Sequence, residues 1–198
     1  MGSEMCIRDR GYDPLKCYTG RSPLEAVSIG IQMDDTDVAF RCNLVTLSDD
    51  AEYAEKTMVD YSSGEITTAE AAELIRAVDE AFRTDEILFY PGISYRHCMI
   101  WHQGPVGLNL TPPHDISDRK ITEYLPQNPV ILDLMKRSYE ILKAHPINQD
   151  RMARGLNPAN SIWLWGEGTR PGVTGFEAAY GVKASVISAV DLIKGIGL

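Results

Sequence analysis

Apolar and polar residues alternate most regularly in the segment DVAFRCNLVTL, residues 37–47. An alternation with a period of two predicts a β-strand with one buried face. Phe40 and Cys42 fall on one face of this strand, and Arg41 and Asn43 fall on the other. The segment therefore places an arginine and an asparagine side by side on a rigid element.

Helical periodicity is clearest in the segment Thr68–Arg83, where apolar residues recur every three or four positions. The run Thr67-Thr68-Ala69-Glu70 before it is a capping box, which is typical of a helix N-terminus. Three further helices are predicted: Pro23–Ile29, opened by a capping box at Ser22-Pro23-Leu24-Glu25, then Pro129–Ala144 and Asn148–Arg154.

The remaining segments read as strands, loops and short helices. The predicted strands are Met58–Tyr61, Glu86–Tyr90, Tyr95–His102, Ser161–Trp165 and Ala184–Ala189. The predicted loops are Leu110–Lys120 and the glycine-rich Gly166–Gly175, and the predicted short helices are Phe176–Tyr180 and Val190–Ile196. Strands and helices in this mixed order predict an α/β or α+β fold with a mixed sheet.

Composition is that of a globular protein with a substantial core. The chain has 198 residues, of which 44% are hydrophobic and 24% charged, enough for one large domain or two small ones. The net charge of −9 argues against a nucleic-acid partner, because nucleic-acid binders carry a basic excess. A few converging arginine and histidine side chains can still form a local pocket for a small anion.

The sequence favours a cytoplasmic protein. Its apolar runs are shorter than the roughly 20 residues of a membrane span, and its first residues do not resemble a signal peptide. None of the four cysteines forms a CxxC pair, so free thiols in a reducing compartment are expected. These cysteines are Cys6, Cys17, Cys42 and Cys98. The sequence leaves the oligomeric state open.

Two groups of polar residues stand out as candidate chemistry on predicted strands. Arg41 with Asn43 either lies on a solvated strand face or presents a guanidinium fork for a carboxylate or phosphate. Arg96 and His97 follow the Pro91-Gly92 turn on opposite strand faces. Arg96 suits an anion, whereas His97 either transfers a proton or is a structural histidine.

Two further groups lie outside those strands. In the rigid run Thr111-Pro112-Pro113-His114-Asp115, a carboxylate sits beside an imidazole and can orient it. Lys194 follows the predicted strand Ala184–Ala189, and either contacts a ligand at the strand's carboxyl end or is an ordinary exposed lysine.

Well-known catalytic motifs are absent from the sequence. It contains no GxSxG, Walker, GxGxxG or HExxH motif, and its histidines lack helical i, i+4 spacing. No metal site is therefore expected from this chain alone. From the residues alone, the chain is predicted to be an acidic domain with arginine and histidine sites for a small anion.

Six motifs in order carry a resemblance to a known family. They are GYDPLKCYTGRSPLEAVSIGI, DVAFRCNLVTLSDD, FYPGISYRHCMIW, LTPPHDISDRKITEYLP, NPANSIWLWGEG and VISAVDLIKGIG. Over about residues 11–198 the chain resembles the archaeal-type, 2,3-bisphosphoglycerate-independent phosphoglycerate mutases of the alkaline phosphatase superfamily.

This resemblance implies an α/β architecture in which an α+β domain with a mixed sheet is inserted into an alkaline-phosphatase-like core. It assigns residues 11–35 to part of the core, 36–175 to the inserted substrate-binding domain, and 176–198 to a return to the core. Residues 1–10 (MGSEMCIRDR) match neither part and read as a non-native leader.

The resemblance also implies a glycolytic activity, in which a serine relays the phosphoryl group between 3-phosphoglycerate and 2-phosphoglycerate. Two divalent metals, manganese, zinc or magnesium, serve the full-length enzyme. In this chain the implied catalytic residue is Lys194, which contacts the phosphoryl group. The implied substrate-binding residues are Arg41, Asn43, Arg96, His97, His114, Asp115 and, as a weaker candidate, Arg21.

The family's metal-binding and nucleophile motifs find no match in these 198 residues, and Ser3 is not assigned as the nucleophile. The chain is therefore expected to be a central fragment that holds no metal and is inactive alone. Three alternatives stay open: a homoserine kinase of the same family, a non-catalytic anion-binding module, and a truncated product without a function of its own.

Overall fold

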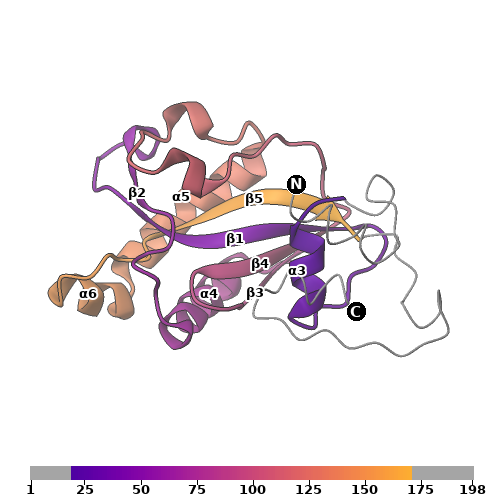
Figure 1. Ribbon diagram of the computed structural model, residues 1–198, viewed down its shortest axis with the longest axis horizontal. Helices are drawn as coiled ribbons and strands as arrows, with labels where there is room; N and C mark the ends of the chain where they lie inside the picture. The colour runs from indigo at the N-terminus through magenta and orange to yellow at the C-terminus, as the bar shows by residue number, and fades with distance from the viewer. Residues whose placement is uncertain (1–18, 171–198) are drawn as a thin grey trace, which may run out of the picture.

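A computed structural model describes residues 19–170, which form a five-stranded sheet with helices on both faces (Figure 1). Strand β1 pairs with β4 on one side and β5 on the other, β3 extends the sheet beyond β4, and β2 pairs with the far end of β1. The strands are β1 (Asp37–Leu47), β2 (Met58–Asp60), β3 (Ile87–Tyr90), β4 (Arg96–His102) and β5 (Ser161–Thr169).

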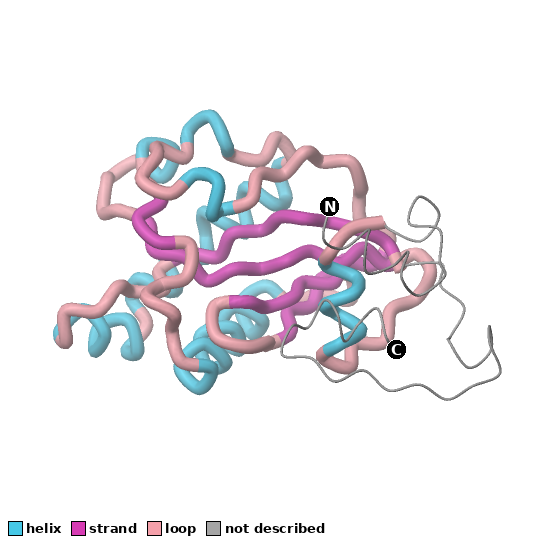
Figure 2. The backbone as a smooth tube through the Cα atoms, viewed as in Figure 1, coloured by secondary structure: helices cyan, strands magenta, loops and turns pink. Residues whose placement is uncertain are grey.

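Helices α4 and α5 pack behind the sheet, whereas α3 crosses its front (Figure 1). The α-helices are α3 (Ser22–Ser28), α4 (Thr68–Phe82), α5 (Pro129–Ala144) and α6 (Pro146–Ala153). Three short 3-10 helices lie in the connections: η1 (Tyr53–Glu55), η2 (Pro113–Ile116) and η3 (Thr122–Tyr124). The connection that holds η2 and η3 runs along the outer edge of β5 (Figure 2).

The predicted start and buried stripe of α4 are confirmed. The Thr67 hydroxyl accepts a hydrogen bond from the Glu70 amide at 3.3 Å and donates one to the Glu70 carboxylate at 2.7 Å. The apolar stripe of the helix is buried against the sheet. Its buried residues are Ala71, Leu74, Ile75, Val78 and Phe82.

Two apolar clusters are buried against the sheet, and the larger one reaches both faces, because it includes Trp165 as well as Phe40. The rear face joins α4 and α5 in a large cluster that includes Phe40 and Cys42 of β1. The front face forms a small cluster with α3, in which Ala26 meets Ala39 and Cys98. Because both faces are covered, β1 is buried at every position. The prediction of a strand with one exposed face, and with it the solvated alternative for Arg41, is corrected.

The predicted mixed sheet is also corrected, because every strand pairing in the described residues is antiparallel. A short turn joins β3 to β4. The longer connections also place each strand antiparallel to its neighbours. The α/β class itself is supported by the combination of one sheet with helices on both faces.

Strand β5 continues to Thr169, beyond the predicted strand end at Trp165. Gly168 pairs with Ala39 of β1, so the first part of the predicted glycine-rich loop belongs to the sheet. A Cβ atom at Gly168 would lie 2.7 Å from the Thr19 carbonyl oxygen. Glycine is therefore needed here because the segment before α3 passes close to the strand, rather than for a loop.

Ser22 does not cap α3 as predicted. The N-cap residue is Arg21, which makes no side-chain cap, and the Ser22 hydroxyl donates to the Gly166 carbonyl oxygen instead. The bond ties α3 to β5. The hydroxyl is thus used between elements rather than within one.

Several predictions lie outside the described residues: the leader 1–10, the elements after residue 170, and the domain boundaries at 10/11 and 175/176. Within residues 19–170, the helices are too short or too polar to cross a membrane. Cys42 and Cys98 are free and buried, in agreement with the expected thiols.

Candidate anion-binding site

Arg41, Asn43 and Arg96 meet on the front face of the sheet, although they come from two separate sequence motifs. In the pairing of β1 with β4, Asn43 lies opposite Arg96 and Arg41 lies opposite Cys98. Residues directly opposite each other share a face, so all three side chains project to the same side. The same face receives Trp165 of β5, which lies opposite Arg41.

The guanidinium of Arg41 is held in a largely buried setting. Arg41 is only 8% exposed, its Nε lies 2.9 Å from Oε2 of Glu25 on α3, and its Cζ lies 4.4 Å from the centre of the Trp165 ring. Burial is the main cause that lowers the pKa of Arg41, and the carboxylate of Glu25 opposes it. An arginine stays charged under such a shift, so a fixed positive charge sits here.

Two more arginines add positive charge to the same place. Arg21 and Arg96 both lower the pKa of Arg41 through charge repulsion, so both lie within electrostatic reach of it. Within residues 19–170, no carboxylate forms an ion pair with Arg21 or Arg96. The Nε atom of Arg96 is buried and has no hydrogen-bond partner. Arg41, with Arg21 and Arg96 within electrostatic reach of it, forms a local positive site in a protein of net charge −9.

Asn43 is fixed through both ends of its amide. Its Oδ1 accepts a hydrogen bond from Nε1–H of Trp165 at 3.1 Å, and its Nδ2 donates to the Tyr61 carbonyl oxygen at 3.4 Å. The residue is 2% exposed. The amide is therefore a rigid part of the site wall.

The connection after β4 brings His114 to the same aromatic residue. The His114 ring lies 5.4 Å from that of Trp165 and 6.1 Å from that of Tyr61, edge to face in both cases. Its Nε2 lies 3.7 Å from Oδ1 of Asp115, and both side chains are exposed, by 46% and 62%. The predicted His-Asp pair is thus a loose surface pair at the margin of the site.

His97 lies on the rear face, away from Arg96. Its Nδ1 accepts a hydrogen bond from the Gly92 amide at 3.0 Å, whereas its buried Nε2 has no partner. Burial lowers the pKa of His97 to about 3, so the ring is neutral. His97 thus stabilises the turn between β3 and β4. Its contact with a substrate stays a prediction.

Sequence reasoning missed Trp165 and Glu25, which complete the site, and the role of Tyr61. The segment SIWLW indicates a buried strand, but only the pairing of β5 with β1 places Trp165 against Arg41. Glu25 was visible as part of the Ser22 capping box, and its carboxylate is used on Arg41 instead. Lys194 lies outside the described residues.

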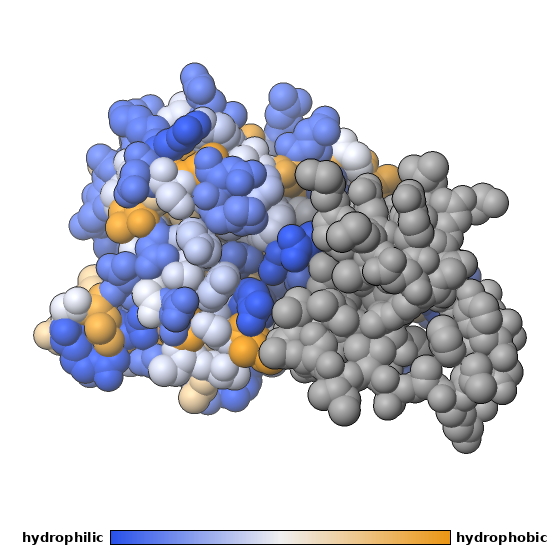
Figure 3. Space-filling model, in the orientation of Figure 1, coloured by the Kyte–Doolittle hydropathy of each residue, from blue (hydrophilic) through white to orange (hydrophobic). Residues whose placement is uncertain are grey.

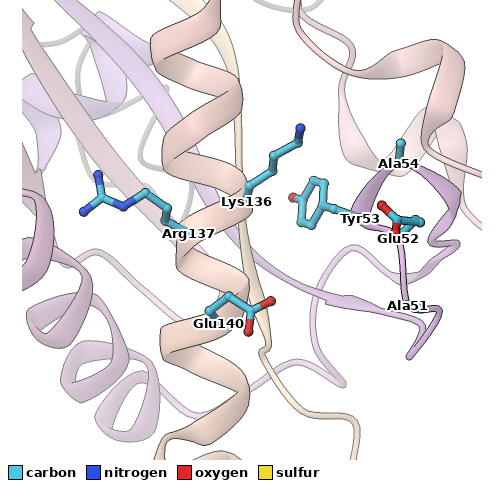
Figure 4. Close-up of a pocket in the computed structure, with 7 residues that line it drawn as sticks. All are labelled: Ala51, Glu52, Tyr53, Ala54, Lys136, Arg137 and Glu140. Carbon is cyan, nitrogen blue, oxygen red and sulfur yellow. The ribbon is translucent and has the colours of Figure 1, made fainter.

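A hollow on the surface is lined by none of the predicted site residues, and Figure 4 shows the residues that line it. It has a volume of about 330 Å³, lies between α5 and the segment around η1, and mixes acidic and basic side chains. Its lining residues are Ala51, Glu52, Tyr53, Ala54, Lys136, Arg137 and Glu140. The coloured part of the surface in Figure 3 is mostly polar, with small separate apolar patches.

The described residues do not supply a metal site. Across residues 19–170, no three histidine, cysteine, aspartate or glutamate side chains gather closely enough to hold a metal ion. No step of the chemistry is therefore assigned to a metal in this part of the chain.

The family that the motifs resemble agrees with a comparison against protein families. A family model described as 2,3-bisphosphoglycerate-independent phosphoglycerate mutase matches residues 10–148. The chain belongs to this family. The match includes Arg21, Arg41, Asn43 and Arg96, so the positive site lies within the region that defines the family.

Curated mutases of this family are similar over nearly the whole chain. A probable 2,3-bisphosphoglycerate-independent phosphoglycerate mutase of Geobacter sulfurreducens is 49% identical over 191 residues, which is 95% of this chain and 47% of that protein. A mutase of Methanosarcina barkeri is 47% identical, with the same coverage. The chain thus spans about half the length of the curated relatives it matches.

Solved structures agree with the fold. The PH0037 protein from Pyrococcus horikoshii has a TM-score of 0.72 at 25% identity, over 99% of this chain and 45% of that one. A cofactor-independent phosphoglycerate mutase from Thermoplasma acidophilum has a TM-score of 0.60 at 23% identity, over 98% and 53%. The second likeness concerns the fold alone.

Proposed function

We propose that this chain supplies the substrate-binding part of a phosphoglycerate mutase that interconverts 3-phosphoglycerate and 2-phosphoglycerate. The observation that carries the proposal is the placement of Arg41, Asn43 and Arg96 on one face of the sheet, with Arg21 within electrostatic reach of Arg41. Phosphoglycerate carries a carboxylate and a phosphate, and planar guanidinium groups bind both in a bidentate manner.

In this proposal Arg41 and Arg96 bind the acidic groups of the substrate from the front face of the sheet. Arg41 is held before substrate arrives, and the unpartnered Nε of Arg96 gains an acceptor when it binds. Asn43 completes the wall, and Arg21 adds charge from α3. The fixed positive charges stabilise the anion as it reorients.

The remaining candidates have more distant roles. His114, exposed at the margin of the site, exchanges protons with a substrate hydroxyl, and Asp115 orients its ring. His97 maintains the turn that precedes Arg96. Lys194 contacts the transferring phosphoryl group, as the family resemblance implies.

The wider organisation follows the same proposal. Residues 36–175 form the inserted substrate-binding domain, and the flanking segments belong to a phosphatase-like core that supplies the serine and the divalent metals. The protein acts in the cytoplasm on a small phosphorylated substrate, because such phosphorylated intermediates are retained inside the cell.

Calorimetric titration of the 198-residue chain with 3-phosphoglycerate tests the proposal. Saturable binding is expected, tighter than that of inorganic phosphate, and weakened by Arg41→Ala. Binding no tighter than that of inorganic phosphate would contradict it. In a full-length relative, ATP-dependent phosphorylation of homoserine in place of mutase activity would overturn the assigned reaction.

A further inference from the structure

Trp165 touches three of the candidate site residues, yet no sequence motif assigns it a role. Its indole N–H bonds to Asn43, its ring lies against the Arg41 guanidinium, and His114 meets it edge to face. We propose that Trp165 is the positioning residue of the anion site, which fixes the orientation of Asn43 and Arg41 before substrate binds. This inference rests on the proposed function.

The orientation of the Asn43 amide follows from the indole. An indole N–H can only donate, so the atom of Asn43 that faces it must be the oxygen. The Nδ2 group is thereby turned toward the Tyr61 carbonyl oxygen, where it donates one of its two hydrogens. In the opposite orientation two donors would face each other and two acceptors would face each other, and both buried hydrogen bonds would be lost.

Consequently, Asn43 has one N–H left to give, and it acts toward a ligand as a donor. A donor is the group that an anion needs. Trp165 thus selects the amide orientation that is compatible with a carboxylate or phosphate, although it contributes no charge itself.

The guanidinium of Arg41 is restricted from two directions. Its Cζ lies 4.4 Å from the centre of the Trp165 ring, and its Nε is 2.9 Å from Oε2 of Glu25. No residue of the 19–170 segment accepts a hydrogen bond from its Nη atoms. The Arg41 guanidinium therefore uses one face to stack on Trp165 and one edge to pair with Glu25. Its Nη donors remain for a ligand, and because the group is already ordered, binding costs less conformational entropy.

The position of Trp165 is in turn built into the sheet. It lies opposite Arg41, next to the register shift in the pairing of β1 with β5. The following residue, Gly166, has a φ of +64°, a conformation that favours glycine. Ser22 of α3 donates to the Gly166 carbonyl oxygen. The helix that carries Glu25 is thus attached to the residue next to Trp165.

Substituting Trp165→Phe in the full 198-residue chain tests the inference, because phenylalanine keeps an aromatic face but removes the N–H. Calorimetry should show 3-phosphoglycerate bound about tenfold more weakly, the equivalent of one lost hydrogen bond. The matched control is Trp101→Phe. Trp101 packs on Phe40 at 6.3 Å on the rear face, and its substitution should leave affinity within about twofold of the original value.

A double substitution separates positioning from a general effect on folding. In the Asn43→Ala background, Trp165→Phe should have less than about a twofold further effect, because the partner of the indole N–H is already absent. Unchanged affinity of Trp165→Phe alone would overturn the inference. A full tenfold loss that persists in the Asn43→Ala background would overturn it as well.

An NMR measurement without ligand distinguishes failure of the inference from failure of the proposed function. The Trp165 indole N–H should exchange slowly with solvent, and at least about tenfold faster in Asn43→Ala. A rapidly exchanging indole in the original chain contradicts the inference alone. A protected, Asn43-dependent indole in a chain that binds no 3-phosphoglycerate contradicts the proposed function alone.

Discussion

The two faces of the strand pair β1–β4 carry opposite chemistry, although their residues alternate one by one along the same segments. On the front, Arg41 and Arg96 carry positive charge beside an aromatic ring. On the rear, Cys42 and His97 are buried and uncharged, and Cys42 belongs to the large apolar cluster. Burial alone therefore does not separate the faces, since β1 is buried throughout. What separates them is charge, since the front carries the guanidiniums of Arg41 and Arg96, whereas Cys42 and His97 on the rear are neutral.

This difference shows where a ligand is needed. On the rear of this strand pair, Nε2 of His97 is the one buried polar atom that lacks a hydrogen-bond partner, and the ring carries no charge. On the front face, Arg41 pairs with Glu25, whereas Arg96 has no ion-pair partner within residues 19–170. The Nε of Arg96 is buried without a hydrogen-bond partner, and an unsatisfied buried donor is costly, so the front face is suited to receive an anion.

The largest change in free energy is expected from a cavity-forming substitution on the rear face. Phe40 is fully buried in the large cluster, so Phe40→Ala should lower the free energy of unfolding by about 3–5 kcal/mol. Urea denaturation measures this loss. Affinity for 3-phosphoglycerate, measured where the variant is folded, should be unchanged. A specific loss of affinity in the folded variant would show that the two faces are not independent.

The next largest change in free energy is expected from removing an arginine of the front face. Arg96→Ala should weaken 3-phosphoglycerate binding by about 2–4 kcal/mol, because a desolvated partner of the anion is lost. Stability should change little. The control is Arg76→Ala on α4, where the arginine is exposed and pairs with Glu73 at 2.5 Å. An effect of Arg96→Ala below about 0.5 kcal/mol would place Arg96 outside the binding site.

The dependence of stability on pH tests whether the rear face holds a neutral His97 ring. Its pKa is about 3 in the folded chain against an ordinary 6.5, so the unfolded chain binds a proton more readily between these values. Stability is therefore highest above pH 6.5 and falls as the pH is lowered, by about 2 kcal/mol at pH 5.

His97→Gln should remove this part of the pH dependence, since glutamine does not titrate and its oxygen can still accept from the Gly92 amide. Urea denaturation at several pH values measures the slope. Equal slopes for His97→Gln and the original chain would contradict a neutral buried ring.

The smallest effect is expected at the start of α4, which covers the rear face. Thr67→Ala removes the cap on the Glu70 amide and should cost about 1 kcal/mol of stability, with no change in anion affinity. Thr67→Ser keeps the hydroxyl and should retain most of that stability. Thermal unfolding of the three proteins measures the difference, and equal losses for both variants would contradict a capping role.

Local sequence rules predicted the elements well where the elements are determined locally. The stripe of α4 and its capping box, and the alternation in β1, are contained in short segments. The strand order, the antiparallel pairing and the extension of β5 to Thr169 depend on contacts between distant segments. The same limit explains Ser22, whose hydroxyl binds Gly166 across 144 positions rather than its own helix.

The arginines and the asparagine of the candidate site were predicted, but Glu25 and the arrangement of the site were not. Arg41, Asn43 and Arg96 were identified by residue type and strand position, and the register of β1 with β4 brings them together. His97 was placed correctly on the opposite strand face, but its burial and bond to Gly92 were not visible in the sequence. Trp165 was missed because an aromatic residue in an apolar strand gives no sign of what it faces.

The most direct test of the front-face site is an NMR titration of the chain with 3-phosphoglycerate that follows the arginine Nε–H signals. The Arg96 and Arg41 signals should shift and saturate together, whereas the His97 ring signals should not move. Static arginine signals, with saturable shifts at the hollow formed by Tyr53 and Lys136 instead, would contradict the account.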